Sequence, residues 1–153
     1  DGAYRWSTYA EFGIKMRRLR AIFRRDGMTR GDRVAIITGN SEEFALTAYA
    51  AYGLGGIIVP MYEVQKQTDW EFIFGDSEPM LAVVSTDAIR DKVREFDCPS
   101  LRRIYVIRPQ DPDDPDSFHR LIDNEAEELE IAEGLSDSDV SDIIYTSART
   151  GTS

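Results

Sequence analysis

Apolar positions near the start of the chain recur with the period of a helix. Between residues 8 and 26, apolar side chains lie three or four positions apart, which predicts a helix with one buried face. These side chains are Phe12, Met16, Leu19 and Phe23. Thr8 and Glu11 have the spacing of a capping box at the start of this helix. Gly27 follows the last apolar turn and predicts its end.

Short apolar runs then alternate with further helical stretches. The predicted strands are Val34–Ile37, Ile57–Val59, Met80–Val84, Ile104–Ile107 and Ile143–Thr146. The predicted later helices are Phe44–Tyr52, Trp70–Phe74, Asp87–Phe96 and Phe118–Ala132. Continuous apolar runs of this length are typical of strands covered on both faces. The alternation therefore predicts an α/β fold of βαβ units around a mainly parallel sheet.

Two of the later helices also have candidate capping boxes. Asn40 and Glu43 have the required spacing before the second helix, and Thr68 and Glu71 repeat it before the third. We therefore expect Asn40 and Thr68 to cap these helices.

The longest uncharged stretch, residues 44–62, approaches the length of a membrane span. Gly53, Gly55 and Gly56 interrupt its middle, and Pro60 interrupts its end. Such punctuation predicts a buried helix followed by a buried strand. We expect a cytoplasmic protein with no transmembrane segment, for which peripheral contact with a membrane stays open.

Charge is distributed unevenly along the 153 residues. The chain carries 28 acidic and 18 basic residues, a net charge of −10. Residues 1–110 hold 15 acids and 16 bases, whereas residues 111–153 hold 13 acids and 2 bases. This balance argues against nucleic acid as a partner, because phosphate binding needs a positive surface. The single cysteine, Cys98, excludes an internal disulfide and a cysteine-rich zinc site.

Three charged or polar features have structural as well as functional interpretations. Six basic residues between Lys15 and Arg25 could bind an anionic surface, or could pair with the acidic last third. The segment 111–116 contains four aspartates but lacks the glycine and closing glutamate of a calcium loop, so a stiff solvated connector is favoured. His119 is the only histidine and is expected at the surface. No metal site and no catalytic acid or base are assigned.

The last twelve residues hold the candidate site. An apolar strand from Asp142 leads into a segment rich in hydroxyl groups that ends near Gly151. Backbone N–H groups and Ser or Thr hydroxyls that follow a strand can cradle a phosphate. A turn without a ligand is the alternative for such a cluster.

The segment 142–152 resembles the strand and phosphate loop of AMP-forming adenylating enzymes, which include acyl-CoA synthetases, luciferases and peptide-synthetase adenylation domains. The family loop reads Tyr-Thr-Ser-Gly-Thr-Thr-Gly followed by Pro-Lys-Gly. Five residues match it in register: Tyr145, Thr146, Ser147, Thr150 and Gly151. Upstream segments agree in order: Trp6–Phe12, residues 31–36, Asn40-Ser41, residues 53–56, Val59–Glu63 and Asp76-Ser77. Residues 60–63, Pro-Met-Tyr-Glu, look most like the long-chain fatty acyl-CoA ligases.

This resemblance implies a fold and an activity. Residues 1–153 would be part of the N-terminal domain of a longer enzyme: an α/β core to residue 110, an acidic loop, helix and connector over 111–141, and a strand with a truncated phosphate loop over 142–153. The parent would use ATP, Mg²⁺ and CoA to activate a fatty acid or other carboxylate as an acyl-adenylate and transfer the acyl group to CoA. The implied ATP-binding residues are Thr146, Ser147, Thr150 and Gly151.

Two departures from the family pattern change these expectations. Ala148 and Arg149 stand where the family has Gly-Thr, so Arg149 either contacts phosphate or blocks the cradle. The sequence ends at Ser153, where Pro-Lys-Gly should begin, so we expect the isolated chain to be inactive. The alternative is a non-catalytic α/β module for interaction or homo-oligomerisation, because uncovered sheet edges and apolar surface favour association.

Overall fold

A four-stranded sheet lies at the centre of the structure, a computed structural model that describes residues 6–146. The strands are β1 (Arg33–Ile37), β2 (Ile57–Met61), β3 (Leu81–Thr86) and β4 (Arg103–Arg108), in the spatial order β2-β1-β3-β4. The helices are α1 (Tyr9–Arg25), α2 (Glu42–Tyr52), α3 (Gln67–Ser77), α4 (Asp87–Arg94) and α5 (Phe118–Asn124). All three strand pairs are parallel, which confirms the predicted α/β class.

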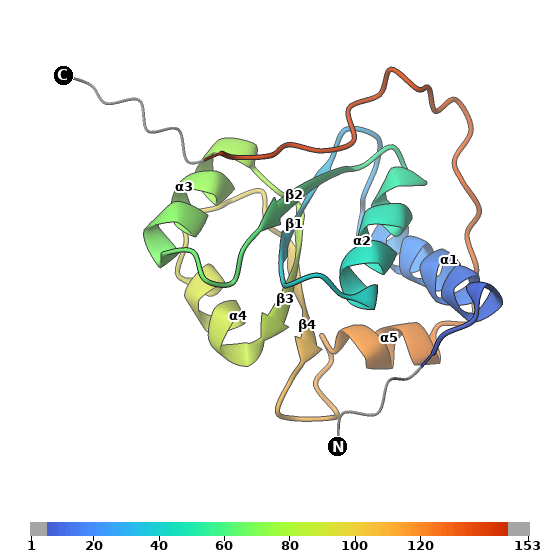
Figure 1. The fold of residues 1–153 in the computed structure, drawn as a ribbon, viewed down its shortest axis with the longest axis horizontal. Coiled ribbons are helices and arrows are strands. Elements are labelled where there is room, and N and C mark those ends of the chain that lie inside the picture. The colour runs from blue at the N-terminus through green and yellow to red at the C-terminus, as the bar shows by residue number, and fades with distance from the viewer. Residues whose placement is uncertain (1–5, 147–153) are drawn as a thin grey trace.

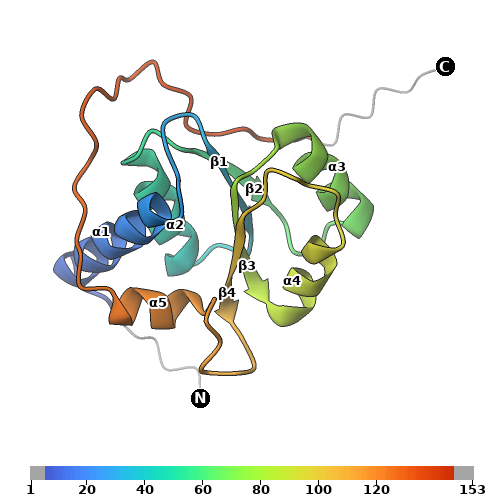
Figure 2. The same ribbon diagram turned by 180° about the vertical axis from the view of Figure 1, so that it is seen from behind.

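Helices cover both faces of the sheet. Helices α1, α2 and α5 pack on one face, and α3 and α4 pack on the other (Figures 1 and 2). The chain passes from β1 to β2 on one side and then crosses to β3 on the other side of β1. This reversal places a topological switch point at the carboxyl ends of β1 and β3, where open α/β sheets usually bind ligands.

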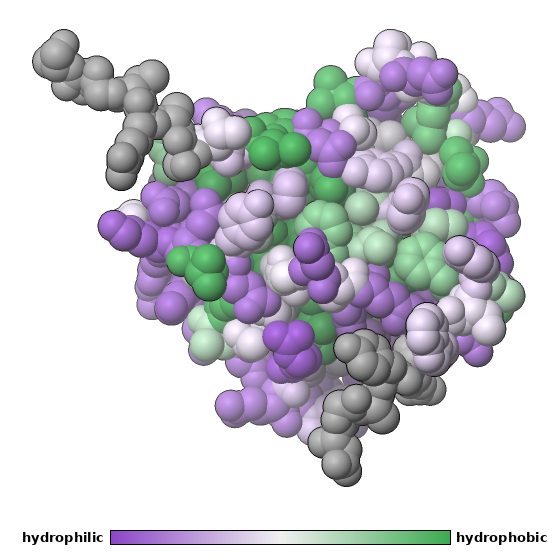
Figure 3. Space-filling view, viewed as in Figure 1, coloured by the Kyte–Doolittle hydropathy of each residue, from purple (hydrophilic) through white to green (hydrophobic). Residues whose placement is uncertain are grey.

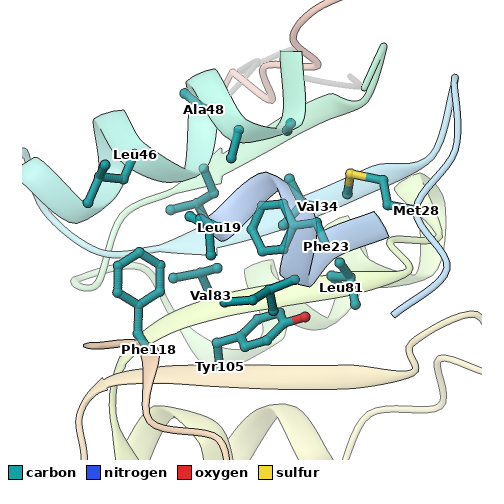
Figure 4. Close-up of a cluster of buried hydrophobic side chains, with 14 of the residues drawn as sticks. Leu19, Phe23, Met28, Val34, Leu46, Ala48, Leu81, Val83, Tyr105 and Phe118 are labelled. Atoms are coloured by element: carbon teal, nitrogen blue, oxygen red, sulfur yellow. The ribbon is translucent and has the colours of Figure 1, made fainter. Parts of the chain in front are cut away.

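The face under α1 and α2 holds the larger apolar cluster (Figure 4). Leu19 and Phe23 of α1 are buried in it, and Phe12 and Met16 pack partly buried against it, as the helical spacing predicts. The ring of Phe23 lies 5.5 Å from that of Tyr105 on β4, so the cluster joins the first helix to the far edge of the sheet.

Both ends of α1 follow their sequence signals. The Glu11 N–H donates to the Thr8 hydroxyl at 3.1 Å, and the Thr8 N–H donates to the Glu11 carboxylate at 3.0 Å. Gly27 has a φ of 104°, which glycine adopts without strain. The predicted capping box and stop are confirmed.

The two other predicted capping boxes are wrong. Ser41 caps α2 instead of Asn40, since its hydroxyl accepts from the Phe44 N–H at 3.2 Å. Helix α3 begins at Gln67, so Thr68 lies inside the helix, and Lys66 at the N-cap makes no side-chain bond. Burial of Trp70, whose indole N–H donates to the Tyr62 carbonyl at 3.0 Å, helps to set this start through tertiary packing.

The predicted helix over 118–132 is also shorter than expected. Helix α5 ends at Asn124, and the chain continues without helix past α1 and then past the end of α2 as a segment that we call the acidic strap, residues 125–140 (Figure 1). Carboxylates of the strap pair with α1: Arg25 with Glu125 at 2.5 Å and Arg17 with Glu128 at 3.0 Å. These pairs confirm that the basic face of α1 binds the acidic last third of the chain.

Arg20 is a buried charge beneath the acidic strap. Its side chain is 2% exposed and donates to three carbonyls, of Tyr49 at 2.9 Å, Ala50 at 3.3 Å and Leu129 at 3.1 Å. A Cβ at Gly53 would lie 2.0 Å from this guanidinium, so glycine leaves room for it at the end of α2. Arg20 thus supplies a donor to the Ala50 carbonyl at the end of α2 and joins this helix to the strap through Leu129.

The uncharged stretch 44–62 is divided as predicted. It forms most of α2 and then β2. Within residues 6–146, no helix combines the length and apolar character needed to cross a membrane.

The aspartate-rich loop is less solvated than predicted. Asp114 is 8% exposed, and its carboxylate pairs with Arg90 of α4 at 2.8 Å. The loop is therefore partly tied to the domain, because a buried carboxylate requires a cation or hydrogen-bond donors nearby.

Candidate functional site

Thr146 is the one implied ATP-binding residue that the structure describes, and it is exposed. Ser147, Thr150 and Gly151 lie outside the described residues, as does Arg149. The candidate site is therefore built from the segment that leads into this loop, residues 141–146, which we call the entry segment.

The entry segment runs beside β2 and parallel to it. The Ile58 N–H donates to the Ser141 carbonyl at 2.8 Å, and the Ile143 N–H donates back to the Ile58 carbonyl at 2.9 Å. A single parallel bridge, Ile58 to Asp142, results. The segment therefore advances in the direction of the strands, toward the carboxyl edge of the sheet.

The predicted strand Ile143–Thr146 is wrong, because none of these four residues forms a strand. The next donor on β2 would be residue 60, which is Pro60 and has no N–H. Pairing ends after the one bridge, and residues 143–146 continue without a ladder. The proline thus separates the end of the entry segment from the sheet.

Two tyrosine–aspartate hydrogen bonds tie the entry segment to the helices. The Tyr52 hydroxyl, in the last residue of α2, donates to the Asp142 carboxylate at 2.7 Å. The Tyr145 hydroxyl donates to the carboxylate of Asp76, in the last turn of α3, at 2.6 Å. Burial and then the Asp76 carboxylate raise the pKa of Tyr145 to about 12. Burial and Asp142 raise the pKa of Tyr52 in the same way.

A pocket of about 380 Å³ opens beside this segment, at the carboxyl ends of β1 and β2. Its lining includes Thr38 after β1, Phe44 of α2, Ile73 of α3, and Ile144 and Tyr145 of the entry segment. The lining is aromatic and aliphatic with hydroxyl and amide groups, and it contains no charged side chain. Such a pocket favours an uncharged or apolar part of a ligand.

Apolar side chains are also exposed near this edge. They are Tyr62 at 74%, Val64 at 93%, Phe72 at 66% and Ile144 at 70%. Apolar surface is visible across the middle of the face seen in Figure 1 (Figure 3). Exposed apolar surface of this kind is common at sites that bind a ligand or another part of a protein.

His119 does not stand alone at the surface as expected. Its Nε2 lies 2.9 Å from the Glu43 carboxylate, so α5 is linked to the first turn of α2. The hydrogen bond to His119 lowers the pKa of Glu43 to about 2. Within residues 6–146, no group of three His, Cys, Asp or Glu side chains is arranged to hold a metal ion.

The two hydrogen bonds that hold the entry segment were not predicted from the sequence. Tyr52 lies 90 residues from Asp142, and Asp76 lies 69 residues from Tyr145. No periodicity or local motif signals a contact over such separations. The resemblance includes Asp76 and Tyr145 as separate matches, and the fold brings them together.

Comparison with known proteins identifies the family. A family model described as AMP-binding enzyme matches residues 1–153. The chain belongs to the AMP-binding enzyme family. Because the chain belongs to this family, the alternative of a non-catalytic interaction module is not favoured.

Relatives within the AMP-binding family are CoA ligases. The chain is 28% identical to the long-chain-fatty-acid–CoA ligase FadD15 of Mycobacterium bovis, over 99% of this chain and 26% of that protein. It is 27% identical to the crotonobetaine/carnitine–CoA ligase of Escherichia coli O1:K1, over 94% of this chain and 28% of that protein. The chain therefore spans about a quarter of the length of these relatives.

Solved structures in the AMP-binding family share the fold. The N-terminal domain of FACL13 from Mycobacterium tuberculosis matches with a TM-score of 0.79 and 25% identity, over 95% of this chain and 35% of that one. The anthranilate CoA ligase AuaEII, in complex with anthranoyl-AMP, matches with a TM-score of 0.82 and 21% identity, over 94% and 27% of the two chains. ATP-bound MatB from Rhodopseudomonas palustris matches with a TM-score of 0.78 and 24% identity, over 94% and 27%.

Proposed function

We propose that this chain is the N-terminal portion of an ATP-dependent, AMP-forming fatty acyl-CoA ligase. The enzyme would activate a carboxylate as its acyl-adenylate, release pyrophosphate, and transfer the acyl group to CoA. Membership of the AMP-binding family supports the reaction class. The likeness to a long-chain-fatty-acid–CoA ligase supports a fatty acid as the carboxylate.

The observation that carries this proposal is the course of the entry segment. It runs parallel to the strands toward their carboxyl edge, where α/β folds bind nucleotides, and it leads into the Thr146–Gly151 match. We propose that hydroxyls of Thr146, Ser147 and Thr150 and the backbone at Gly151 bind the β- and γ-phosphates of ATP. Donors held in place before the reaction stabilise charge that develops as pyrophosphate leaves.

The parent enzyme would need more than these residues. A carboxylate is a poor acyl donor until AMP becomes its leaving group, and ATP supplies that group. Within residues 6–146, no group of His, Cys, Asp or Glu side chains is arranged to hold Mg²⁺, so these residues have no assigned role toward the metal ion. The described residues position the loop entry and line a pocket with no charged side chain.

ATP binding by the chain is the direct test. Calorimetry with and without Mg²⁺ would compare the chain with an Ala148→Gly/Arg149→Thr variant that restores the family's loop residues. Binding by both proteins, or by the variant alone, supports a phosphate loop, and the second result assigns the defect to these two residues. If neither binds, the loop does not hold ATP in this chain.

Product analysis tests the substrate class. We expect the longer enzyme that contains this chain to convert palmitate, ATP and CoA into palmitoyl-CoA, AMP and pyrophosphate. Formation of AMP with aromatic or short acids and none with palmitate would contradict the fatty-acid proposal. The purified 153-residue chain should form no acyl-CoA, and detection of this product would overturn that part of the proposal.

A further inference from the structure

The entry segment is held at both ends from opposite faces of the sheet. Tyr52 belongs to α2, which packs on the face with α1, and Asp76 belongs to α3, which packs on the other face (Figure 1). Tyr52 binds Asp142 at the start of the segment, and Asp76 binds Tyr145 near its end. The one backbone bridge of the segment is formed by Asp142 itself, at the first of these two contacts.

The backbone alone gives the segment little attachment. Pro60 ends the pairing with β2, so no ladder holds residues 144–146 in place. Ile144 is 70% exposed, so it adds little packing. Ile143 and Tyr145 pack partly buried against the apolar cluster under α3 and α4, and the ring of Tyr145 meets that of Phe72 edge-on at 6.4 Å. The hydroxyl adds the directed contact that this packing lacks.

We propose that Tyr52 and Asp76 are positioning residues for the phosphate loop. Through Asp142 and Tyr145 they fix where the segment leaves the sheet, and hence where Thr146 stands. This inference rests on the proposed function for its link to ATP. The two pairs Tyr52–Asp142 and Asp76–Tyr145, which we call the clamp, belong to the described structure.

Removing single hydroxyls isolates the clamp. Tyr145→Phe and Tyr52→Phe keep the rings and delete one hydrogen bond each, while Tyr9→Phe is a matched control because Tyr9 is 99% exposed and its hydroxyl has no hydrogen bond within residues 6–146. Amide hydrogen exchange by NMR would follow Ile58 and Ile143, whose N–H groups form the bridge. We expect exchange at these two amides to rise about threefold to tenfold in both clamp variants.

If Tyr52 and Tyr145 only stabilise the domain as a whole, amide exchange should change elsewhere too. Loss of general stability would raise exchange throughout the central strands, including Ala35 of β1 and Val83 of β3, along with the two bridge amides. A rise confined to Ile58 and Ile143 supports positioning. Unchanged exchange at the bridge, or an equal rise throughout the sheet, would overturn the proposal.

Measurement of ATP affinity tests whether the clamp acts on the phosphate loop. In the Ala148→Gly/Arg149→Thr background, we expect Tyr145→Phe and Tyr52→Phe to weaken ATP binding about threefold to tenfold, with Tyr9→Phe unchanged. Local exchange with unaltered ATP affinity would overturn the link to the loop. If the background itself binds no ATP, the proposed ATP site fails in this chain, while the exchange pattern still decides whether the clamp exists.

Discussion

Some charged side chains that the sequence pattern places at the surface are buried or paired in the structure. Arg20 lies within the basic stretch of α1, yet it is 2% exposed and joins α1 to the end of α2 and to the acidic strap. Burial lowers its pKa, and three carbonyl acceptors offset the loss of water. Glu43 and His119 form a second such link, between α2 and α5.

Removal of Arg20 should destabilise the domain strongly. Arg20→Ala removes one shared donor from three carbonyls, of which that of Tyr49 keeps the Gly53 N–H, and it opens a cavity. We therefore expect a loss of about 3 kcal/mol in the free energy of unfolding. Urea denaturation would measure it. Arg24→Ala is the matched control, because Arg24 is exposed on the same helix and should change stability by less than about 0.5 kcal/mol. Equal effects of the two variants would contradict the role assigned to Arg20.

The link between Glu43 and His119 should make stability depend on pH in acid. The pKa of Glu43 is about 2 in the fold, below its usual value, so the ionised form stabilises the protein above about pH 4.5. This contribution is lost as the pH falls toward 2. Because Glu43 is partly exposed, we expect Glu43→Gln to cost less than about 1 kcal/mol at pH 6. Thermal unfolding of both proteins from pH 6 to 2 should show the difference closing, and a constant difference would contradict it.

At the scale of elements, local signals are reliable where no other part of the chain competes. The capping box at Thr8 precedes a long helix and forms as predicted. The equivalent spacing at Thr68 does not form a cap, because α3 begins earlier, where burial of Trp70 favours the start. The helix predicted to Ala132 stops at Asn124, since strap carboxylates pair with arginines of α1 instead of stacking along one helix.

Two threonine variants test whether Thr8 caps its helix and Thr68 does not. Thr8→Ala should cost about 1 kcal/mol, because the Glu11 N–H at the start of α1 loses its acceptor. Thr68→Ala should change stability by less than about 0.5 kcal/mol, since its side chain caps nothing. Chemical denaturation of both would check the order, and an equal or larger cost for Thr68→Ala would contradict the observed start of α3.

At the scale of the whole molecule, electrostatic pairing brings the last third of the chain onto the first helix. Residues 111–153 carry the net negative charge, with 13 acids against 2 bases, and the acidic strap places part of it against Arg17, Arg25 and Arg30. The same strap leads into the entry segment. Its position therefore depends on charge pairs that salt can screen.

Protease sensitivity of the acidic strap should rise with salt. We expect a glutamyl endopeptidase to cleave within residues 125–130 faster at about 0.5 M than at about 0.05 M NaCl, as the ion pairs weaken. Arg17→Gln/Arg25→Gln should be cleaved quickly at both salt concentrations. A peptide substrate measured in parallel corrects for the enzyme's own salt dependence. Salt-independent cleavage of the unaltered chain would show that the pairs do not hold the strap.

The sequence by itself determined the fold class, the order of the elements and the family. Alternating apolar runs and amphipathic stretches predict the parallel sheet, because burial depends on a period that each segment carries within itself. The resemblance at Tyr145–Gly151 identifies the adenylating enzymes, and the family match over residues 1–153 confirms it.

The extent of several elements and the contacts of the entry segment depend on packing between distant parts of the chain. The strand predicted over Ile143–Thr146 does not form, and pairing is limited to one bridge at Asp142 because Pro60, on another strand, has no N–H to donate. Only the packed fold therefore sets how far such elements extend and what holds the entry segment. The clamp pairs Tyr52 with Asp142 and Asp76 with Tyr145 across long separations in sequence. Such contacts depend on the packing of α2 and α3 on opposite faces of the sheet, and no local pattern of residues records that geometry.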